Sequence, residues 1–208
     1  MNRADFFARW SALHGDASIT GVVKGWLSIS FRCAQLLTRL RITPNVLTFS
    51  GVILAAAAWP LARSWWALPL VMFSLVADGL DGSLAIYGAR DSIRGALIDS
   101  CADRITEAFF LLVFYQIAPT AATALFLAWV LSFTQEYIRA RAMGLGNKST
   151  GVVTISERPV RVIILLVALV GSHVSHNFTE ISAYFWLVLQ FIAISQLVRF
   201  QRRSIELA

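Results

Sequence analysis

The sequence predicts an all-α, polytopic membrane protein with six transmembrane helices and an N-terminal amphipathic helix at the membrane interface. Of its 208 residues, 57% are hydrophobic and only 14% are charged. One bilayer crossing needs about 20 mainly apolar residues, so six crossings would occupy most of the chain. Short breaks that contain proline, glycine or arginine separate the apolar stretches. We therefore expect an interfacial segment at 1–43, a six-helix transmembrane domain at 44–203 and a cytoplasmic tail at 204–208.

The interfacial segment is predicted from the spacing of its apolar residues. Within 1–41, aromatic and aliphatic residues such as Trp10, Trp26 and Phe31 recur at intervals of three and four, with basic residues between them. This pattern is typical of a helix that lies in the membrane interface. Two interpretations stay open: a membrane anchor beside a lipid entrance, or simple packing against the other helices.

Six spans follow in chain order. We expect them at about 44–62, 65–86, 94–117, 121–143, 159–171 and 182–197. Pro44 and Pro159 suit the first turn of the first and fifth spans, because the proline nitrogen needs no intrahelical partner there. Gly82 and Gly95 would let a neighbouring helix or a ligand approach closely.

The distribution of charge predicts the topology. The chain carries 18 basic and 12 acidic residues, a net charge of +6. Nearly all basic residues fall in the N-terminal segment, in the connections 87–94 and 139–161, and at the C-terminus. The positive-inside rule therefore predicts a multi-pass protein of the cell membrane with both termini and the 87–94 connection in the cytoplasm. No soluble segment could carry a nucleic-acid-binding surface, so the charge indicates contact with anionic lipid.

Four aspartates lie in or beside the second and third spans, namely Asp78, Asp81, Asp99 and Asp103. A bare carboxylate at membrane depth is costly, so such residues are functional candidates. Spacings of three and four residues put each pair on one face of its helix. Four facing carboxylates would repel one another unless hard cations lie between them. Oxygen ligands suit Mg²⁺ or Mn²⁺, and two such ions commonly act in phosphoryl chemistry.

The segment 78–103 resembles the signature of the CDP-alcohol phosphotransferases, D-x-x-D-G-x-x-A-R, eight residues, then G-x-x-x-D-x-x-x-D. Every spacing is met. One position departs, because Ile86 stands where the family has an arginine that helps to hold the nucleotide. The resemblance implies that the four aspartates bind two divalent ions and that Asp103 acts as a general base. It implies a donor-binding set of Asn45, Gly82, Ala85 and Gly95, with Arg90 or Arg94 in place of the missing arginine.

A second group consists of arginines at the expected cytoplasmic helix ends: Arg139, Arg141, Arg158, Arg161 and Arg199. Guanidinium groups bind phosphate oxygens in bidentate geometry, although each arginine could instead meet lipid head groups. Residues two apart cannot share a helix face, so we expect only one of the first two to point inward. The segments 137–142 and 157–161 resemble actinobacterial phosphatidylinositol phosphate synthases, in which these basic residues hold the phosphate of inositol phosphate.

The resemblance implies an enzyme of phospholipid biosynthesis that moves a phosphatidyl group from CDP-diacylglycerol to an alcohol and releases CMP. Inositol phosphate is the first expected acceptor and glycerol phosphate the second, and the resemblance also implies a homodimer. Two hypotheses compete with this one. The chain could be a degenerate relative that binds nucleotide or lipid without turnover. It could also be a cation transporter, although transport predicts acids spread through the membrane depth rather than clustered at one end.

Overall fold

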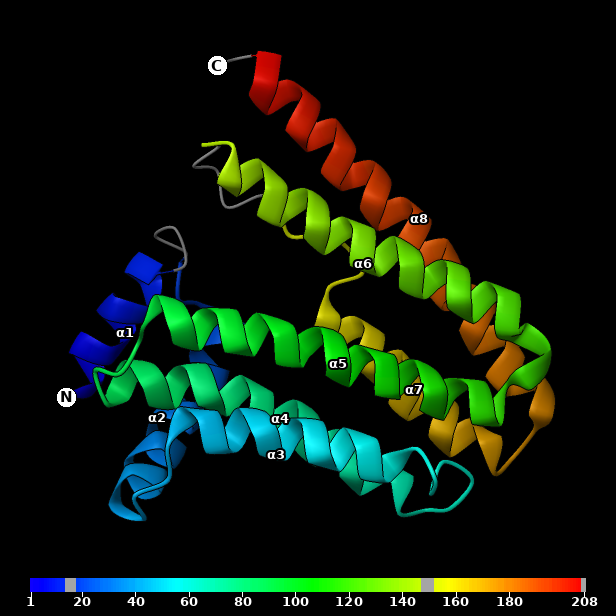
Figure 1. Ribbon diagram of the computed structural model, residues 1–208, viewed down its shortest axis with the longest axis horizontal. Helices are drawn as coiled ribbons and strands as arrows, with labels where there is room; N and C mark the ends of the chain where they lie inside the picture. Colours follow the sequence, from blue (N-terminus) through cyan, green and yellow to red (C-terminus); the bar gives the residue numbers. More distant parts are fainter. Residues whose placement is uncertain (14–17, 147–151, 207–208) are drawn as a thin grey trace. The chain divides into compact units, whose positions relative to one another are not determined.

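The structure is a computed structural model that describes residues 1–13, 18–146 and 152–206. In this part of the chain all regular structure is helical, which confirms the all-α prediction. The helices shown in Figure 1 are α1 (Arg3–Leu13), α2 (Gly21–Arg39), α3 (Pro44–Ala58), α4 (Ala67–Tyr87), α5 (Ile93–Ile117), the 3-10 helix η1 (Pro119–Ala121), α6 (Ala122–Gly144), α7 (Arg158–Ser172) and α8 (His176–Glu206).

The helices from α3 onward correspond one by one to the six apolar stretches expected from the sequence. The last of them, α8, extends beyond the predicted 182–197 at both ends. The prediction of a single N-terminal helix is wrong, because the structure has two helices, α1 and α2, before α3. Gly21 begins α2 with a left-handed backbone (φ 53°) after an extended Thr20, so α2 does not continue a helix from before Thr20. The connection 139–161 and the expected tail 204–208 lie partly outside the described residues.

Six membrane crossings are not established by helix length and composition. Among the described residues, α4 and the part Asn177–Ser204 of α8 are long and apolar enough to cross a bilayer. A third crossing is counted if α2 and α3, which meet at an angle of 108°, form one span. The helices α3 and α7 have only 15 residues each, about 22 Å of helix, which is shorter than the hydrocarbon core.

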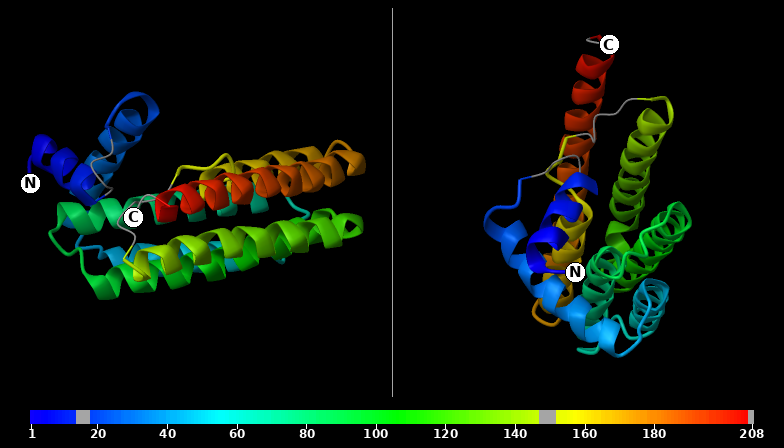
Figure 2. Two further views of the ribbon diagram at one scale, coloured as in Figure 1. Left: turned by 90° about the horizontal axis from the view of Figure 1, so that it is seen from above. Right: turned by 90° about the vertical axis from the view of Figure 1, so that its left-hand side faces the viewer.

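Two compact units share the chain, and three helices contribute to both. The first unit comprises residues 1–55 and 72–106. Its apolar cluster joins Phe6 of α1, Leu27 and Phe31 of α2, and Ile86 at the end of α4. The helix α1 contacts α2, and both are drawn in blue in Figure 2.

Within the first unit, polar side chains connect α3 to α4. Ser74 donates a hydrogen bond to the carbonyl oxygen of Gly51 (2.8 Å). The indole of Trp26 lies over Gly79, where an added Cβ would come within 2.7 Å of a ring carbon. The lack of a side chain at this position of α4 therefore lets α2 pack across it.

The second unit comprises residues 56–71 and 107–208, of which 147–151 and 207–208 are not described. Here α8 packs along both α6 and α7 (Figures 1 and 2). The rings of Phe114 and Trp186 stack with their centroids 6.1 Å apart. A buried polar chain runs beside this apolar core: Ser156 donates to Gln190 (2.8 Å), Gln190 donates to Gln135 (2.7 Å), and Gln135 donates to Thr154 (3.1 Å). These bonds satisfy amide groups that would be costly to bury alone.

Candidate active site

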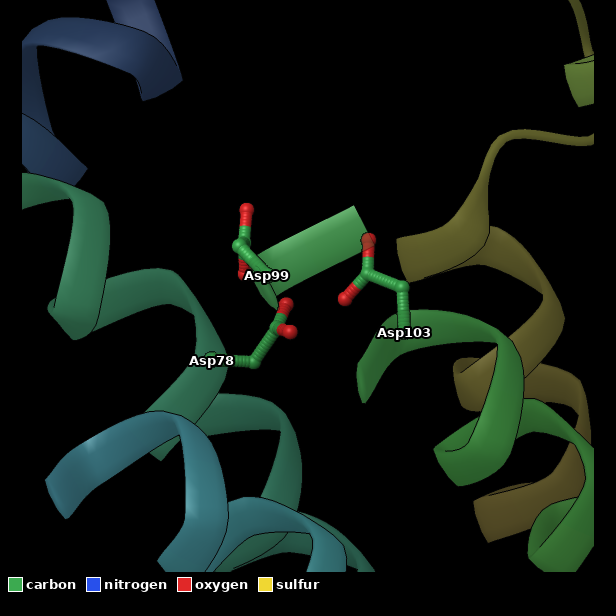
Figure 3. A group of neighbouring side chains, drawn as sticks. All are labelled: Asp78, Asp99 and Asp103. Atoms are coloured by element: carbon green, nitrogen blue, oxygen red, sulfur yellow. The ribbon is translucent and has the colours of Figure 1, made fainter. Parts of the chain in front are cut away.

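Three of the four predicted aspartates come together in the first unit. One carboxylate oxygen from each of Asp78, Asp99 and Asp103 lies within 4.8 Å of the others. Figure 3 shows Asp78 reaching from α4 toward the two side chains of α5. The four-residue spacing of Asp99 and Asp103 puts both on one face of α5, as the sequence predicted. All three side chains are half-buried.

Asp81 lies outside this group of three. Its side chain is 4% exposed and accepts a hydrogen bond from Thr48 of α3 (2.5 Å) and another from the backbone of Gly82 (2.6 Å). The four aspartates therefore differ in environment. Asp78, Asp99 and Asp103 converge on each other, and Asp81 near them accepts hydrogen bonds from Thr48 and Gly82.

A cavity of about 910 Å³ opens beside these aspartates, entirely within the first unit. Asp81 and Asp99 both line it. Its wall also contains the six residues that the resemblance assigned to donor binding: Asn45, Gly82, Ala85, Arg90, Arg94 and Gly95. The structure thus places these six residues around one cavity.

The Gly82 position is open toward the cavity. A Cβ added there would meet nothing within 4 Å, so no neighbouring group of the chain requires glycine at this place. A ligand that approaches the helix backbone would require it.

Two charged groups of the second unit are occupied by protein partners. Arg139 donates to both carboxylate oxygens of Glu157 (2.8 and 2.5 Å) and to the carbonyl oxygen of Val152 (2.9 Å). Burial alone would raise the pKa of the Glu157 carboxyl. The hydrogen bonds from Arg139 and Thr154 outweigh it and hold that pKa below its ordinary value. The pair fixes the segment that precedes α7.

Arg161 is the other occupied arginine. It forms an ion pair with Glu107 of α5, and both side chains are buried, at 5% and 7% exposure. Its second terminal nitrogen donates to the carbonyl oxygen of Ser156 (2.7 Å). The pair thus joins α5 to α7.

The remaining three predicted arginines have different surroundings. Arg141 and Arg199 are exposed, and Arg158 is half-buried at the start of α7. Arg139 is half-buried while Arg141 is exposed, so the two do differ in orientation as their spacing predicted.

Comparison with known proteins identifies the family to which the chain belongs. The sequence model of the CDP-alcohol phosphatidyltransferases matches residues 33–198, which is most of the chain. The chain belongs to this family. As a CDP-alcohol phosphatidyltransferase it is a transferase of substituted phosphate groups and a member of a membrane enzyme family. Its aspartates and its cavity are therefore the places at which the family's chemistry has to be sought.

The relatives narrow the comparison. The phosphatidyltransferase is 31% identical to a phosphatidylinositol phosphate synthase of Mycolicibacterium smegmatis over 152 residues, which cover 68% of each chain. It is 29% identical to an archaetidylinositol phosphate synthase of Pyrococcus horikoshii, over 85% of this chain and 92% of the other. A crystal structure of the phosphatidylinositol phosphate synthase of Mycobacterium tuberculosis with CDP-DAG bound is similar with a TM-score of 0.70 and 26% identity, over 83% of this chain and 93% of that one. The same enzyme in complex with manganese and citrate also has a TM-score of 0.70 and 26% identity, over 82% and 88% of the two chains.

The structure adds cavity residues of the phosphatidyltransferase that the sequence did not single out. Thr48 binds Asp81, and Asp91 and Ser92 line the cavity wall. Ser92 accepts a hydrogen bond from the amide of Gly95 (3.0 Å), which is the bond expected of a residue that caps the N-terminus of α5. A serine followed three residues later by glycine at a predicted helix start could have indicated this cap. No sequence signal could have paired Thr48 with an aspartate 33 residues away.

Proposed function

We propose that this phosphatidyltransferase moves the phosphatidyl group of CDP-diacylglycerol to the hydroxyl of inositol phosphate and releases CMP. The observation that carries the proposal is the convergence of three signature aspartates within 4.8 Å beside a cavity of about 910 Å³. Relatives with similar sequences are phosphatidylinositol phosphate synthases, and a similar solved structure has CDP-DAG bound. Glycerol phosphate is the alternative acceptor.

We assign two divalent ions, Mg²⁺ or Mn²⁺, to the aspartates. Three half-buried carboxylates whose oxygens lie this close repel one another and offer the oxygen ligands that hard cations prefer. Asp78, Asp99 and Asp103 would hold these ions, with Asp81 oriented by Thr48 at the edge of the group. When bound, the ions neutralise the negative charge of the diphosphate and stabilise the departing CMP.

The chain's own residues position the donor. The open surface at Gly82 and Ala85 admits the nucleotide close to α4, and Asn45 offers an amide for hydrogen bonds to the base or the ribose. Arg90 and Arg94 lie on the same cavity wall and bring positive charge to the diphosphate. Positioning and neutralisation of charge supply most of the rate in phosphoryl transfer.

In the transfer step, the acceptor hydroxyl oxygen attacks the phosphorus that carries the diacylglycerol. A new phosphorus–oxygen bond forms, the bond to the CMP oxygen breaks, and CMP leaves with both electrons. Asp103 accepts the proton of the attacking hydroxyl. We assign the phosphate of the acceptor to arginines of the set predicted from the sequence. Within this set we favour Arg141 and Arg199, because both are exposed, whereas Arg139 and Arg161 already bind carboxylates.

We place the protein in the cell membrane as a multi-pass homodimer whose active site faces the cytoplasm. The basic connections support this orientation through the positive-inside rule. For six crossings from α3 to α8, the short helices α3 and α7 would have to span the membrane together with their flanking residues, at places where the bilayer is locally thinner. The 108° bend between α2 and α3 fits an α2 that lies along the membrane surface before α3 enters it. In this arrangement 44–203 is the catalytic domain, 1–43 the interfacial segment and 204–208 the cytoplasmic tail.

The test is release of CMP by the purified protein in detergent with CDP-diacylglycerol and Mg²⁺ or Mn²⁺. Inositol phosphate, inositol and glycerol phosphate are supplied one at a time. We expect CMP with inositol phosphate, and no release after Asp78→Asn, because the metal-binding group loses a charged ligand. Glu180→Gln removes an acidic group outside the aspartate cluster and serves as the matched control.

Each competing hypothesis has its own outcome in this assay. CMP release with glycerol phosphate but not with inositol phosphate would assign the alternative acceptor. Binding of CDP without release of CMP under every condition would leave a degenerate relative. Full turnover in Asp78→Asn would contradict the two-metal proposal.

A further inference from the structure

The N-terminal helix α1 reaches the same cavity as the signature aspartates. Leu13, at the end of α1, lines the cavity together with Asp81 and Asp99. Four residues before it, Arg9 binds Asp91 through one terminal nitrogen, at 2.7 and 3.0 Å from the two carboxylate oxygens. The helix is thus attached to the cavity wall by a polar contact near its last turn.

Apolar packing holds the rest of α1. Phe6 is fully buried between Leu27 and Phe31 of α2 and Ile86 of α4. The rings of Phe6 and Phe31 lie 5.4 Å apart in a tilted arrangement, which is favourable for aromatic pairs. The position of α1 is therefore fixed by the packing of Phe6 and by the contact of Arg9, which lies three residues further along on the same face of the helix.

The partner of Arg9 lies in a tightly bent turn after α4. The amide of Ala89 donates to Ile86 and the amide of Arg90 donates back to Ala85 (2.9 Å), while Ala89 has a left-handed backbone with φ 50°. These two bonds and the left-handed residue form a Schellman motif, a helix ending in which glycine usually takes the position of Ala89. A non-glycine residue in this conformation is held against an energetic cost by its surroundings.

The Arg9 contact also settles the charge of the turn. Asp91 stands between Arg90 and Arg94, and it is the acidic group nearest to both in sequence. The hydrogen bond from Arg9 holds the pKa of the Asp91 carboxyl below its ordinary value, so this group is ionised and neutralised by Arg9. Among the described residues, the side chains of Arg90 and Arg94 have neither a hydrogen bond nor an ion pair, and both line the cavity. Their charge remains available to an anionic ligand.

From these contacts we propose that α1 forms a wall of the donor cavity and that Arg9 is a positioning residue for donor binding. By binding Asp91, Arg9 holds the turn 88–92 in place and prevents Asp91 from neutralising Arg90 and Arg94. The ligand is a molecule with a diphosphate, and the inference rests on the proposed function in this respect. Arg9 acts through the turn and does not contact the reacting atoms.

The kinetic test compares three variants with the wild type. Arg9→Ala is expected to raise the KM for CDP-diacylglycerol roughly fivefold, the upper effect of an exposed ion pair, with kcat within about twofold. Asp91→Arg combined with Arg9→Asp restores a pair of opposite charges and should recover most of the loss. Asp5→Asn changes a charge on α1 without touching the cavity and should leave the KM unchanged.

Chemical labelling gives a readout that does not depend on turnover. Cys33 and Cys101 are replaced by serine and Leu13 by cysteine, and a charged maleimide reports how accessible position 13 is. CDP with Mg²⁺ should slow the labelling, and Arg9→Ala should speed it in the absence of nucleotide. Equal labelling with and without CDP in a protein that does bind CDP would overturn the inference.

The two proposals fail in distinguishable ways. A wild-type protein that is protected by CDP at position 13 but releases no CMP would refute the transfer while supporting the role of α1. A wild-type protein that releases CMP, with Arg9→Ala unchanged in KM and in labelling, would refute the role of α1 and leave the transfer intact. A fall in kcat at unchanged KM would also contradict a positioning role in donor binding.

Discussion

The ion pair between Arg161 and Glu107 permits a quantitative prediction. Both side chains are more than nine-tenths buried, and Arg161 also donates to the carbonyl oxygen of Ser156. Arg161→Ala would break the buried ion pair by removing the guanidinium group that binds the Glu107 carboxylate, a change that typically costs about 3–5 kcal/mol. In a chain of this length each kcal/mol corresponds to roughly 2–4 °C in Tm. With about 4 kcal/mol lost, the expected decrease is roughly 8–16 °C.

Tryptophan fluorescence during heating in detergent measures this effect. Trp129 and Trp186 line a cavity of about 20 Å³ together with Arg161, so their emission reports the loss of packing around it. Arg63→Ala is the matched control, because Arg63 is exposed and makes a single hydrogen bond to the backbone of Gln116. Its expected cost is below about 1 kcal/mol.

A double variant separates the charge from the shape of the side chains. Arg161→Met with Glu107→Gln removes both charges and keeps most of the volume, so it should recover most of the lost Tm. The reasoning would be refuted if Arg161→Ala unfolded at the wild-type temperature and raised the KM of the acceptor instead. Arg161 would then be a substrate ligand, and its pair with Glu107 a contact of little energetic value.

Three further predictions concern Arg199, Glu157 and Ala89. Arg199→Ala should change Tm by less than about 2 °C, because Arg199 is exposed. It should raise the KM for the acceptor at least several-fold more than the KM for the donor, because we assign Arg199 to the acceptor phosphate. A similar change of both KM values would indicate an indirect effect. Glu157→Gln should lower Tm at pH 7. The pKa of the Glu157 carboxyl is held low in the folded protein. The stability that the ionised carboxyl contributes is therefore complete above the unfolded pKa of about 4.3 and is lost as the pH falls through the lower folded value. The Tm difference between Glu157→Gln and wild type should accordingly narrow from about pH 5 downward. Ala89→Gly should raise the free energy of unfolding by about 1 kcal/mol, measured by thermal unfolding, because the backbone there is left-handed; no gain would mean that the turn bears no strain.

The aspartate arrangement was predictable because it depends on local geometry. On a helix, residues three or four apart share a face, so Asp99 and Asp103 had to point the same way. That Asp78 joins them follows from the short turn between α4 and α5. The different surroundings of Asp81 could not be predicted, because they depend on Thr48, which reaches this position only through the packing of α3 on α4.

The pairing of the arginines, in contrast, could not be predicted from local geometry. The sequence predicted all five at cytoplasmic helix ends, but it could not indicate which of them are paired with carboxylates. Arg161 binds a carboxylate on α5 that is 54 residues away in sequence, and Arg139 binds Glu157, which is 18 residues away. Pairings of this length are set by tertiary packing, which the periodicity of one helix does not contain. The separation of exposed from buried arginines is accordingly a result of the structure alone.

The packing of the first unit explains why position 86 is an isoleucine where the family signature has an arginine. Its side chain is 5% exposed and packs against Phe6 of α1, so an arginine there would have to bury its charge among aromatic rings at considerable cost. A chain that uses this position to seat an additional helix must supply positive charge elsewhere on the cavity wall. Arg90 is suited to this because the Schellman motif returns its backbone to Ala85, one residue before Ile86. In our proposal, the isoleucine at position 86 and the attachment of α1 therefore belong together. Ile86 provides the apolar contact for α1 on the signature helix, and Arg90, in the turn that α1 holds, provides the positive charge.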